Sequence, residues 1–151
     1  LALANDSTEV GFNAQWVTAE TSSPLADGSA PSGSRLPQVP EFKGNLWLEK
    51  SIPIGFMGAD ESFFRASVAY TGDSVSAVQP GYSFLQKSYT IVDVKYGIIG
   101  DDWEASIFVS NLTDERAEIA VNDWYFDYFF GRGRQYTNRP REFGIRFTKS
   151  W

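Results

Sequence analysis

The chain has 151 residues, a formal net charge of −6, and neither cysteine nor histidine. A nucleic-acid partner would need a basic face, so the negative charge argues against one. The missing cysteines exclude disulfides and thiolate metal sites, and the missing histidines remove the commonest general base and transition-metal ligand. An aromatic content of 16% and 13 glycines favour strands and turns over helices.

Apolar and polar residues alternate with a period of two along much of the chain, which predicts strands with one apolar and one polar face. The predicted strands fall within residues 9–16, 45–49, 64–70, 91–98, 103–109 and 142–151. The first four residues, Leu1 to Ala4, are expected to end a preceding strand. No stretch approaches the length of about 20 apolar residues that a membrane helix needs.

The predicted connections differ strongly in length. Short or moderate turns are expected at Asp6-Ser7, Pro53–Glu61 and Gly100–Asp102, and long segments at residues 19–38, 72–88 and 112–139. Long loops on one edge and short turns on the other are typical of an outer-membrane barrel. A compact soluble domain rarely carries three connections of this length.

The charged residues indicate which solvent the apolar face meets. Eight of them take the polar parity of their strands: Glu9, Glu49, Arg65, Asp93, Lys95, Glu104, Glu142 and Arg146. Only Lys50 and Lys149 take the apolar parity, and both are predicted near strand ends, where a lysine facing lipid can snorkel at little cost. Aromatic residues near strand ends suit the girdles at the membrane interfaces: Trp16, Tyr70, Tyr89, Trp103 and Trp151. A soluble sandwich or jelly roll would show the same alternation, so alternation alone leaves both open.

Four segments carry a family resemblance. They are Arg35–Pro40, Tyr89–Val94, the run Trp103–Val109 followed by Asn111-Leu112-Thr113-Asp114-Glu115, and Arg139-Pro140-Arg141-Glu142-Phe143-Gly144-Ile145-Arg146-Phe147, which leads to Trp151. In this order, at the end of the chain, they resemble the C-terminal end of a TonB-dependent outer-membrane receptor. Lys149 departs from the pattern, because outer-membrane barrels usually have an apolar residue two positions before the terminal aromatic.

The resemblance implies an all-β fold, an antiparallel up-and-down meander of about six strands within a 22-stranded transmembrane barrel. Residues 1–151 would be the C-terminal segment of that barrel, and the plug domain and earlier strands would lie upstream. Six strands cannot enclose such a lumen, and their open edges would expose unpaired backbone groups to lipid. The chain is therefore expected to be a fragment.

The function implied is TonB-energised uptake of a scarce solute across the outer membrane of a Gram-negative bacterium. Siderophore–iron is the commonest cargo implied, and cobalamin, haem or a sugar stay open. The implied partners are outer-membrane lipid, the TonB complex acting through the plug, the barrel-assembly machinery and a small-molecule ligand such as a siderophore. The alternatives are a soluble carbohydrate-binding β-sandwich and a passive porin-like barrel.

No catalytic residue, cofactor or metal site is expected, and the chain is not expected to be an enzyme. The closely spaced carboxylates favour solvated turns and loops over a glycosidase pair or a calcium site: Asp101-Asp102, Asp114-Glu115, Asp123 and Asp127. The sequence has no Gly-x-Ser-x-Gly motif and no phosphate-binding loop.

Two groups of candidate site residues remain. Aromatic rings and arginines in the last long loop could stack on and pair with an anionic planar ligand, or simply extend the two flanking strands: Trp124, Tyr125, Tyr128, Arg132 and Arg134. The apolar alternation at the C-terminus resembles the signal that barrel-assembly machinery reads: Phe143, Ile145, Phe147 and Trp151. The alternative interpretation is that its aromatic end anchors the chain at a membrane interface.

Overall fold

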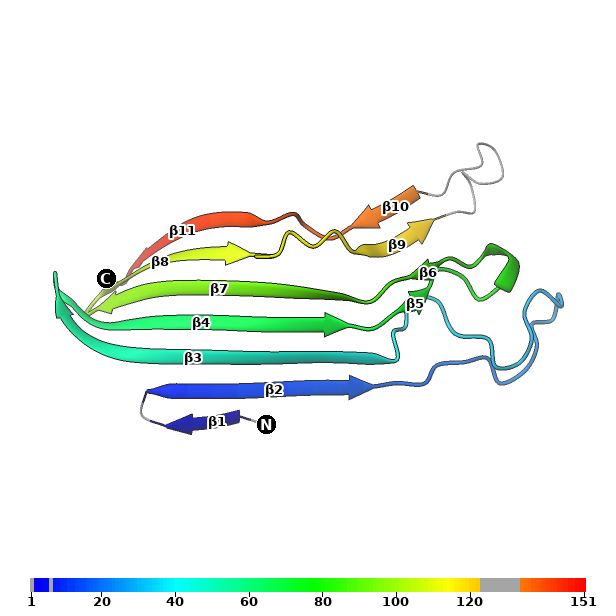
Figure 1. The fold of residues 1–151 in the computed structure, drawn as a ribbon, viewed down its shortest axis with the longest axis horizontal. Coiled ribbons are helices and arrows are strands. Elements are labelled where there is room, and N and C mark those ends of the chain that lie inside the picture. Colours follow the sequence, from blue (N-terminus) through cyan, green and yellow to red (C-terminus); the bar gives the residue numbers. More distant parts are fainter. Residues whose placement is uncertain (1, 6, 123–133) are drawn as a thin grey trace.

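A computed structural model describes residues 2–5, 7–122 and 134–151. Its main element is an antiparallel sheet of six strands with 8 to 15 residues each and one four-residue strand at the edge. The strands are β1 (Ala2–Asn5), β2 (Thr8–Trp16), β3 (Phe42–Phe56), β4 (Ala59–Thr71), β7 (Tyr89–Gly100), β8 (Trp103–Ser110) and β11 (Glu142–Lys149). Each strand pairs with its neighbour in this order, which confirms an all-β, antiparallel, up-and-down meander (Figure 1).

The remaining elements lie beyond one edge of the main sheet. A small hairpin joins β5 (Ser74–Val75) to β6 (Leu85–Gln86), with a 3₁₀ turn at Pro80–Tyr82 between them. A second one pairs β9 (Glu118–Asn122) with β10 (Arg134–Thr137). Residues 72–88 and 112–139, predicted as loops, therefore contain short hairpins. Their strands are too short for alternation to identify them in the sequence.

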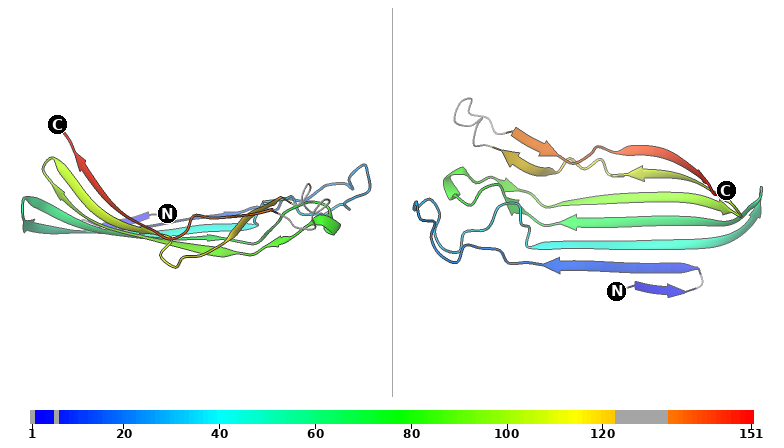
Figure 2. Two further views of the ribbon diagram at one scale, coloured as in Figure 1. Left: turned by 90° about the horizontal axis from the view of Figure 1, so that it is seen from above. Right: turned by 180° about the vertical axis from the view of Figure 1, so that it is seen from behind.

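Short and long connections lie on opposite edges of the sheet, as the sequence predicted (Figures 1 and 2). These edges are formed by the two ends of the strands, not by the outer strands. We call the one with the short turns the short-turn edge and the one with the long connections the long-loop edge. At the long-loop edge the 17–41 connection is tied to the next one, because Arg35 Nη1 lies 2.8 Å from Asp73 Oδ2 and Nη2 donates to Asp73 O. This hydrogen-bonded ion pair holds the pKa of Asp73 below its usual value.

The turn predicted at Pro53–Glu61 is wrong in extent. Strand β3 continues to Phe56, and β4 begins at Ala59. Only Met57 and Gly58 connect them, and both have a positive φ. Positive φ at both central residues is the geometry of the tight hairpin turns that match strand twist. Pro53 misled the prediction because proline usually ends a strand, whereas here it lies at a register irregularity, where a proline is tolerated.

The sheet is a single curved layer (Figure 2). Across the described residues, the buried apolar side chains are few and mostly small: Ala30, Ala59, Phe63, Ala117 and Val121. No helix or second sheet of the described residues packs over either face of the main sheet. Hairpins β5–β6 and β9–β10 extend beyond its long-loop edge instead (Figure 1). Most of the fold therefore depends on strand pairing and cross-strand contacts.

Three aromatic side chains on the polar face cover glycines directly opposite in the neighbouring strand. The pairs are Trp47 on Gly11, Phe63 on Gly97, and Phe108 on Gly144. A strand glycine is normally a weak point, because it has no side chain to pack. Here the ring of the partner occupies the space that a Cβ would take.

Replacing Gly97 with alanine is expected to destabilise the protein by about 1–3 kcal/mol, the usual cost of overpacking. Its Cβ would lie 2.5 Å from the Phe63 ring and 3.0 Å from the Ala105 carbonyl oxygen. Gly55→Ala in β3 is the matched control, because nothing lies within 4 Å of that Cβ. Urea unfolding of both variants in detergent micelles measures the difference, and equal midpoints would contradict the packing argument.

Candidate functional site: an uncovered apolar face

One face of the main sheet carries the apolar parity of every long strand, and we call it the apolar face. Its middle row crosses all six long strands through residues that pair in register: Val10, Leu48, Ala66, Val94, Val109 and Phe143. The side chains around this row remain in contact with solvent. Phe64 is 41%, Ile107 57% and Phe147 66% exposed. Apolar surface of this extent is unusual on a soluble monomer and marks an interaction site.

We call the part of the apolar face that is occupied by apolar side chains the apolar zone, and a set of residues paired across successive strands a row. The apolar zone does not run parallel to these rows. One row begins with Thr8 and Lys50 and becomes apolar as it continues to Phe64, Tyr96, Ile107 and Ile145. Another row is apolar from Phe12 through Leu46 and Val68 to Val92, whose carbonyl accepts from Leu112 N–H just beyond β8. The zone thus shifts toward the short-turn edge from β2 to β8.

The slant of this apolar zone can be estimated from two strands. The apolar run covers Val10–Trp16 on β2 and Trp103–Val109 on β8. Val10 and Val109 lie in the same hydrogen-bonded row. From this row the run on β2 extends toward the long-loop edge, and the run on β8 extends toward the short-turn edge. The runs are displaced by about six residues, or about 20 Å, over four strand spacings of about 4.8 Å each. The zone therefore lies about 45° from the rows, close to the 35–45° strand tilt of membrane barrels.

Aromatic side chains cluster at both limits of the apolar zone. Toward the long-loop edge, the rings of Trp16, Phe42 and Tyr70 follow one another on β2, β3 and β4, with centroids 5.9 and 6.0 Å apart. Toward the short-turn edge, Trp103 stacks on Phe147 at 6.3 Å. Tyr89, predicted to join such a cluster, pairs with Thr71 and takes the polar parity. That prediction was wrong because parity, and not position at a strand end, decides the face, and Tyr89 shares the parity of Asp93 on β7.

The two lysines on the apolar parity occupy different positions. Lys149 ends β11, as predicted, and its Nζ lies 3.3 Å from Asp102 Oδ2. Lys50 is not near a strand end, because β3 continues to Phe56. Its Nζ donates to Thr8 Oγ1, next to the short turn that joins β1 to β2. The slant nevertheless places Lys50 at the limit of the apolar zone, where the row turns polar.

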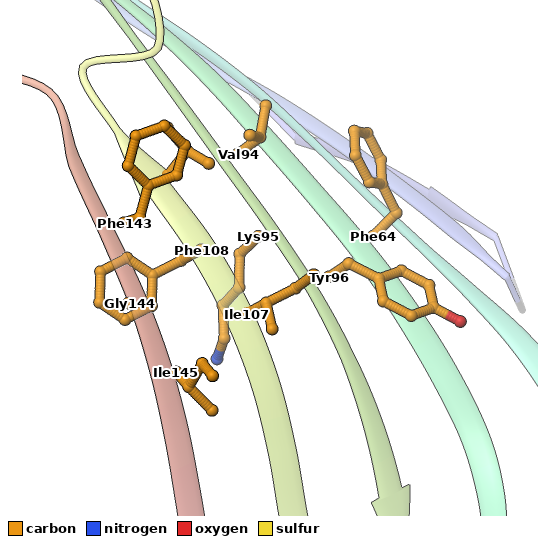
Figure 3. Close-up of a pocket in the computed structure, with 10 residues that line it drawn as sticks. Phe64, Val94, Lys95, Tyr96, Ile107, Phe108, Phe143, Gly144 and Ile145 are labelled. Atoms are coloured by element: carbon orange, nitrogen blue, oxygen red, sulfur yellow. The ribbon is translucent and has the colours of Figure 1, made fainter.

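The centre of the apolar face is hollowed. A shallow hollow of about 610 Å³ lies over β4, β7, β8 and β11 (Figure 3). Side chains from these four strands surround it: Phe64, Val94, Tyr96, Ile107, Phe143 and Ile145. Apart from Lys95 and the Tyr96 hydroxyl, the side chains that line the hollow are apolar, so few polar groups could orient a polar ligand there. The hollow is suited to flexible apolar partners such as acyl chains.

The structure places the predicted C-terminal signal on this face. Phe143, Ile145 and Phe147 take the apolar parity of β11, at one end of the strand order, and all three are exposed. Trp151 follows the strand and is also exposed, with Lys149 Nζ 5.6 Å from its ring centroid.

The predicted ligand-binding loop is only partly described. Trp124, Tyr125, Tyr128 and Arg132 lie outside the described residues. Arg134 is exposed and begins β10, opposite Asn122 of β9. The hypothesis that these residues bind a ligand therefore stays a prediction.

The opposite, polar face carries the charged residues as predicted. Glu9, Glu49, Arg65 and Lys95 form one row across four strands. Arg65 forms an ion pair with Glu49, and Lys95 Nζ lies 2.8 Å from Glu104 Oε1. Among the described residues no three acidic side chains come close enough to suggest a metal site.

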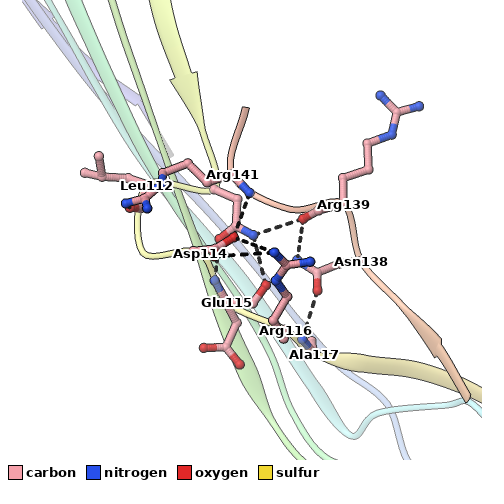
Figure 4. A network of polar contacts seen from close by, with 9 residues as sticks. Leu112, Asp114, Glu115, Arg116, Ala117, Asn138, Arg139 and Arg141 are labelled. Atoms are coloured by element: carbon pink, nitrogen blue, oxygen red, sulfur yellow. Dashed lines mark hydrogen bonds and ion pairs between the residues drawn. The ribbon is translucent and has the colours of Figure 1, made fainter. Parts of the chain in front are cut away.

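The motifs of the two C-terminal segments meet where β8 ends and β11 begins (Figure 4). We call the hydrogen-bonded contact between residues 111–117 and residues 138–141 the clamp. Asn111 Nδ2 donates to the carbonyls of Glu115 and Arg139 at 2.9 and 3.0 Å, and its Oδ1 accepts from Glu115 N–H at 2.9 Å. Asn138 donates to the same two carbonyls and accepts from Ala117 N–H. The backbone of the bend thereby finds partners that no strand supplies.

Two residues of the clamp adopt the left-handed conformation, Asn111 at φ 52° and Asp114 at φ 54°. Asparagine and aspartate tolerate this conformation best after glycine, because their short side chains hydrogen-bond locally. Asp114 Oδ1 accepts from Arg141 N–H at 2.9 Å, and its carboxylate also lies near Arg116. The hydrogen bond from Arg141, aided by the nearby guanidinium groups, holds the pKa of Asp114 below its usual value.

Stability is expected to fall in acid as Asp114 is protonated. Because its pKa is lower in the folded state than in the unfolded chain, its contribution is present above the usual aspartate pKa of about 3.9 and is lost as pH falls through the lower folded value. Asp114→Asn should remove this part of the pH dependence. Unfolding of both proteins between pH 2 and 6 in detergent measures it, and parallel curves would exclude the contribution.

The sequence comparisons add no relative. No protein-family model matches this chain, and no curated protein matches it. Among the described residues, no helix is long and apolar enough to cross a membrane. Within the described residues, these observations define an all-β fold whose main antiparallel sheet has one uncovered, slanted apolar face.

Proposed function

We propose that this sheet is part of the wall of a transmembrane β-barrel, with its apolar face against hydrocarbon. The observation that supports this most directly is the slant of the apolar zone. A flat slab that crosses tilted strands meets each successive strand at a shifted position, and the shift of about 45° agrees with the tilt of barrel strands. The connection lengths, long on one edge and short on the other, also fit such a wall.

The extent of the apolar zone agrees with the proposal. The apolar parity of β3 runs from Phe42 to Ile52, with Lys50 as its one charged residue near the short-turn end, and spans ten residue steps, or about 33 Å along the strand. At a tilt of about 45° this corresponds to a height of about 23 Å, close to the apolar band of about 25 Å on membrane barrels. The aromatic clusters at both limits would then lie at the two interfaces.

Within this class, we propose a TonB-dependent receptor of the outer membrane that takes up a scarce solute, with siderophore–iron as the leading cargo and cobalamin, haem or a sugar as others. The support is the family resemblance of Asn111–Glu115 and Arg139–Phe147, segments that meet in the clamp. A passive porin-like barrel would share the wall but not the plug through which the TonB complex acts. Upstream sequence encoding a plug of domain length decides between them.

The absence of cysteine allows a direct test of the lipid-facing assignment. Single cysteines at Ile107 on the apolar face and at Ser67 on the polar face are placed in the complete barrel to which this segment would belong, with any other cysteine replaced, and that barrel is reconstituted in liposomes. A water-soluble maleimide is expected to label Ser67→Cys at least ten times faster than Ile107→Cys. Lys50→Cys, in the same row as Ile107, should be labelled because it lies at the limit of the apolar zone.

The same variants without lipid or detergent test the soluble alternative. A barrel wall is expected to aggregate in water, because its apolar face would be uncovered. A monodisperse protein that melts cooperatively in water and protects Ile107→Cys there would instead indicate a β-sandwich. Equal labelling of Ile107→Cys and Ser67→Cys in liposomes would also exclude the proposed wall.

A further inference from the structure

A small polar pocket lies at the long-loop edge, away from the apolar zone. Its volume is about 100 Å³, and it lies where β3 begins, β4 ends and the β5–β6 hairpin meets β9. Lys43, Thr71 and Tyr89 share one hydrogen-bonded row on the polar side of the sheet. Gln86 and Lys87 enter from the second connection, and Glu118 from β9.

The side chain of Gln86 supplies a buried hydrogen-bond donor among the residues that line this pocket. The residue is 2% exposed, and its Oε1 accepts from Ser74 Oγ at 2.9 Å. Its amide nitrogen has no hydrogen-bond partner among the described residues. Buried donors are almost always paired in folded proteins, because desolvation without a partner is costly. The unpaired amide therefore calls for an acceptor atom within the pocket.

The charges that line the pocket favour an anion. Lys43 and Lys87 supply two positive charges, while Glu118 supplies one negative charge and accepts from Gln135 Nε2 at 3.1 Å. The lining is thus locally positive in a chain whose net charge is −6. Its volume corresponds to about three waters at about 30 Å³ each, enough for one small charged group.

We infer that this pocket binds an oxyanion, the carboxylate or phosphate group of a small solute. Gln86 donates to one oxygen of the group, and Lys43 and Lys87 neutralise its charge. The inference goes beyond the proposed barrel wall and does not depend on it, because the pocket lies outside the apolar zone. A failure of either proposal leaves the other standing.

The test uses the full chain in a non-ionic detergent at constant ionic strength, titrated with inorganic phosphate and with acetate and followed calorimetrically. Saturable binding of at least one anion is expected, and the tighter one assigns the group. The Lys43→Gln/Lys87→Gln variant should weaken binding at least tenfold, and so should Gln86→Met. The Lys50→Gln/Lys149→Gln variant removes the same charge elsewhere and should bind within twofold of the parent.

The inference is overturned if neither anion binds saturably. It is also overturned if the Lys43→Gln/Lys87→Gln and Lys50→Gln/Lys149→Gln variants bind equally well. Gln86 is buried, so Gln86→Met could fail to fold, and a far-ultraviolet circular dichroism spectrum checks this. In that case the lysine variants decide alone, because both side chains are exposed.

Discussion

Replacing Asn111 with alanine is expected to reduce the free energy of unfolding by about 2–4 kcal/mol. The side chain is 4% exposed and makes three hydrogen bonds, to the Glu115 and Arg139 carbonyls and from Glu115 N–H. The variant would leave the Glu115 N–H without its partner, and each of the two carbonyls would keep only the hydrogen bond that Asn138 donates. Alanine also disfavours the left-handed conformation at φ 52°. Urea unfolding in detergent micelles, followed by tryptophan fluorescence, measures the loss.

Two further variants separate the causes at the clamp. Asn111→Gly loses the same hydrogen bonds without the conformational strain, so it should be more stable than Asn111→Ala by about 1 kcal/mol. Thr113→Ala alters an exposed neighbour in the same bend and should change stability by at most about 0.5 kcal/mol. If Asn111→Ala costs no more than Thr113→Ala, the clamp does not stabilise the sheet.

Replacing Ile107 with arginine is expected to destabilise the protein in lipid by about 2–4 kcal/mol, the cost of an arginine at the middle of a bilayer. Ile107 lies within the apolar run of β8, and its side chain is 57% exposed. In water the same substitution at an exposed position would cost little. Unfolding of the complete barrel in liposomes, with and without the substitution, measures the effect. An unchanged midpoint in lipid would contradict the proposed barrel wall.

Lys50→Ile provides a sharper test of the slant, because Lys50 and Ile107 share one hydrogen-bonded row. In a zone slanted by about 45°, Lys50 lies near the interface, and its replacement should stabilise the protein in lipid by at most about 1 kcal/mol. In a zone parallel to the row, Lys50 would lie as deep as Ile107. Its replacement would then stabilise the protein by about 2–4 kcal/mol.

Much of the architecture was predictable because alternation is a local property. The runs at Val10–Trp16 and Trp103–Val109 became strands β2 and β8, with their apolar residues on one face. The charges of Arg65 and Lys95 lie on the opposite face, as predicted. The prediction for Tyr89 was mistaken because its parity, which is that of Asp93, places it on the polar face. The turn at Pro53 was mistaken because the length of a hairpin depends on the partner strand.

The polar pocket gave no signal in the sequence. Gln86 is the second residue of a two-residue strand, and Lys43 lies more than 40 residues before it. Only the pairing of β3 with β4 and of β4 with β7 brings Lys43, Thr71 and Tyr89 into one row. The sequence did identify the segments of the clamp, but not the hydrogen bonds of Asn111 and Asn138 that join them.

The sequence by itself determined the all-β class, the two faces of each strand and the contrast between short and long connections. These follow from the period of two and from turn residues, which act within a few positions of the chain. The tertiary structure alone decided the register, and with it the slant of the apolar zone, the clamp and the polar pocket. Hydrogen bonds between strands fix register, and they join residues whose sequence separation carries no local pattern.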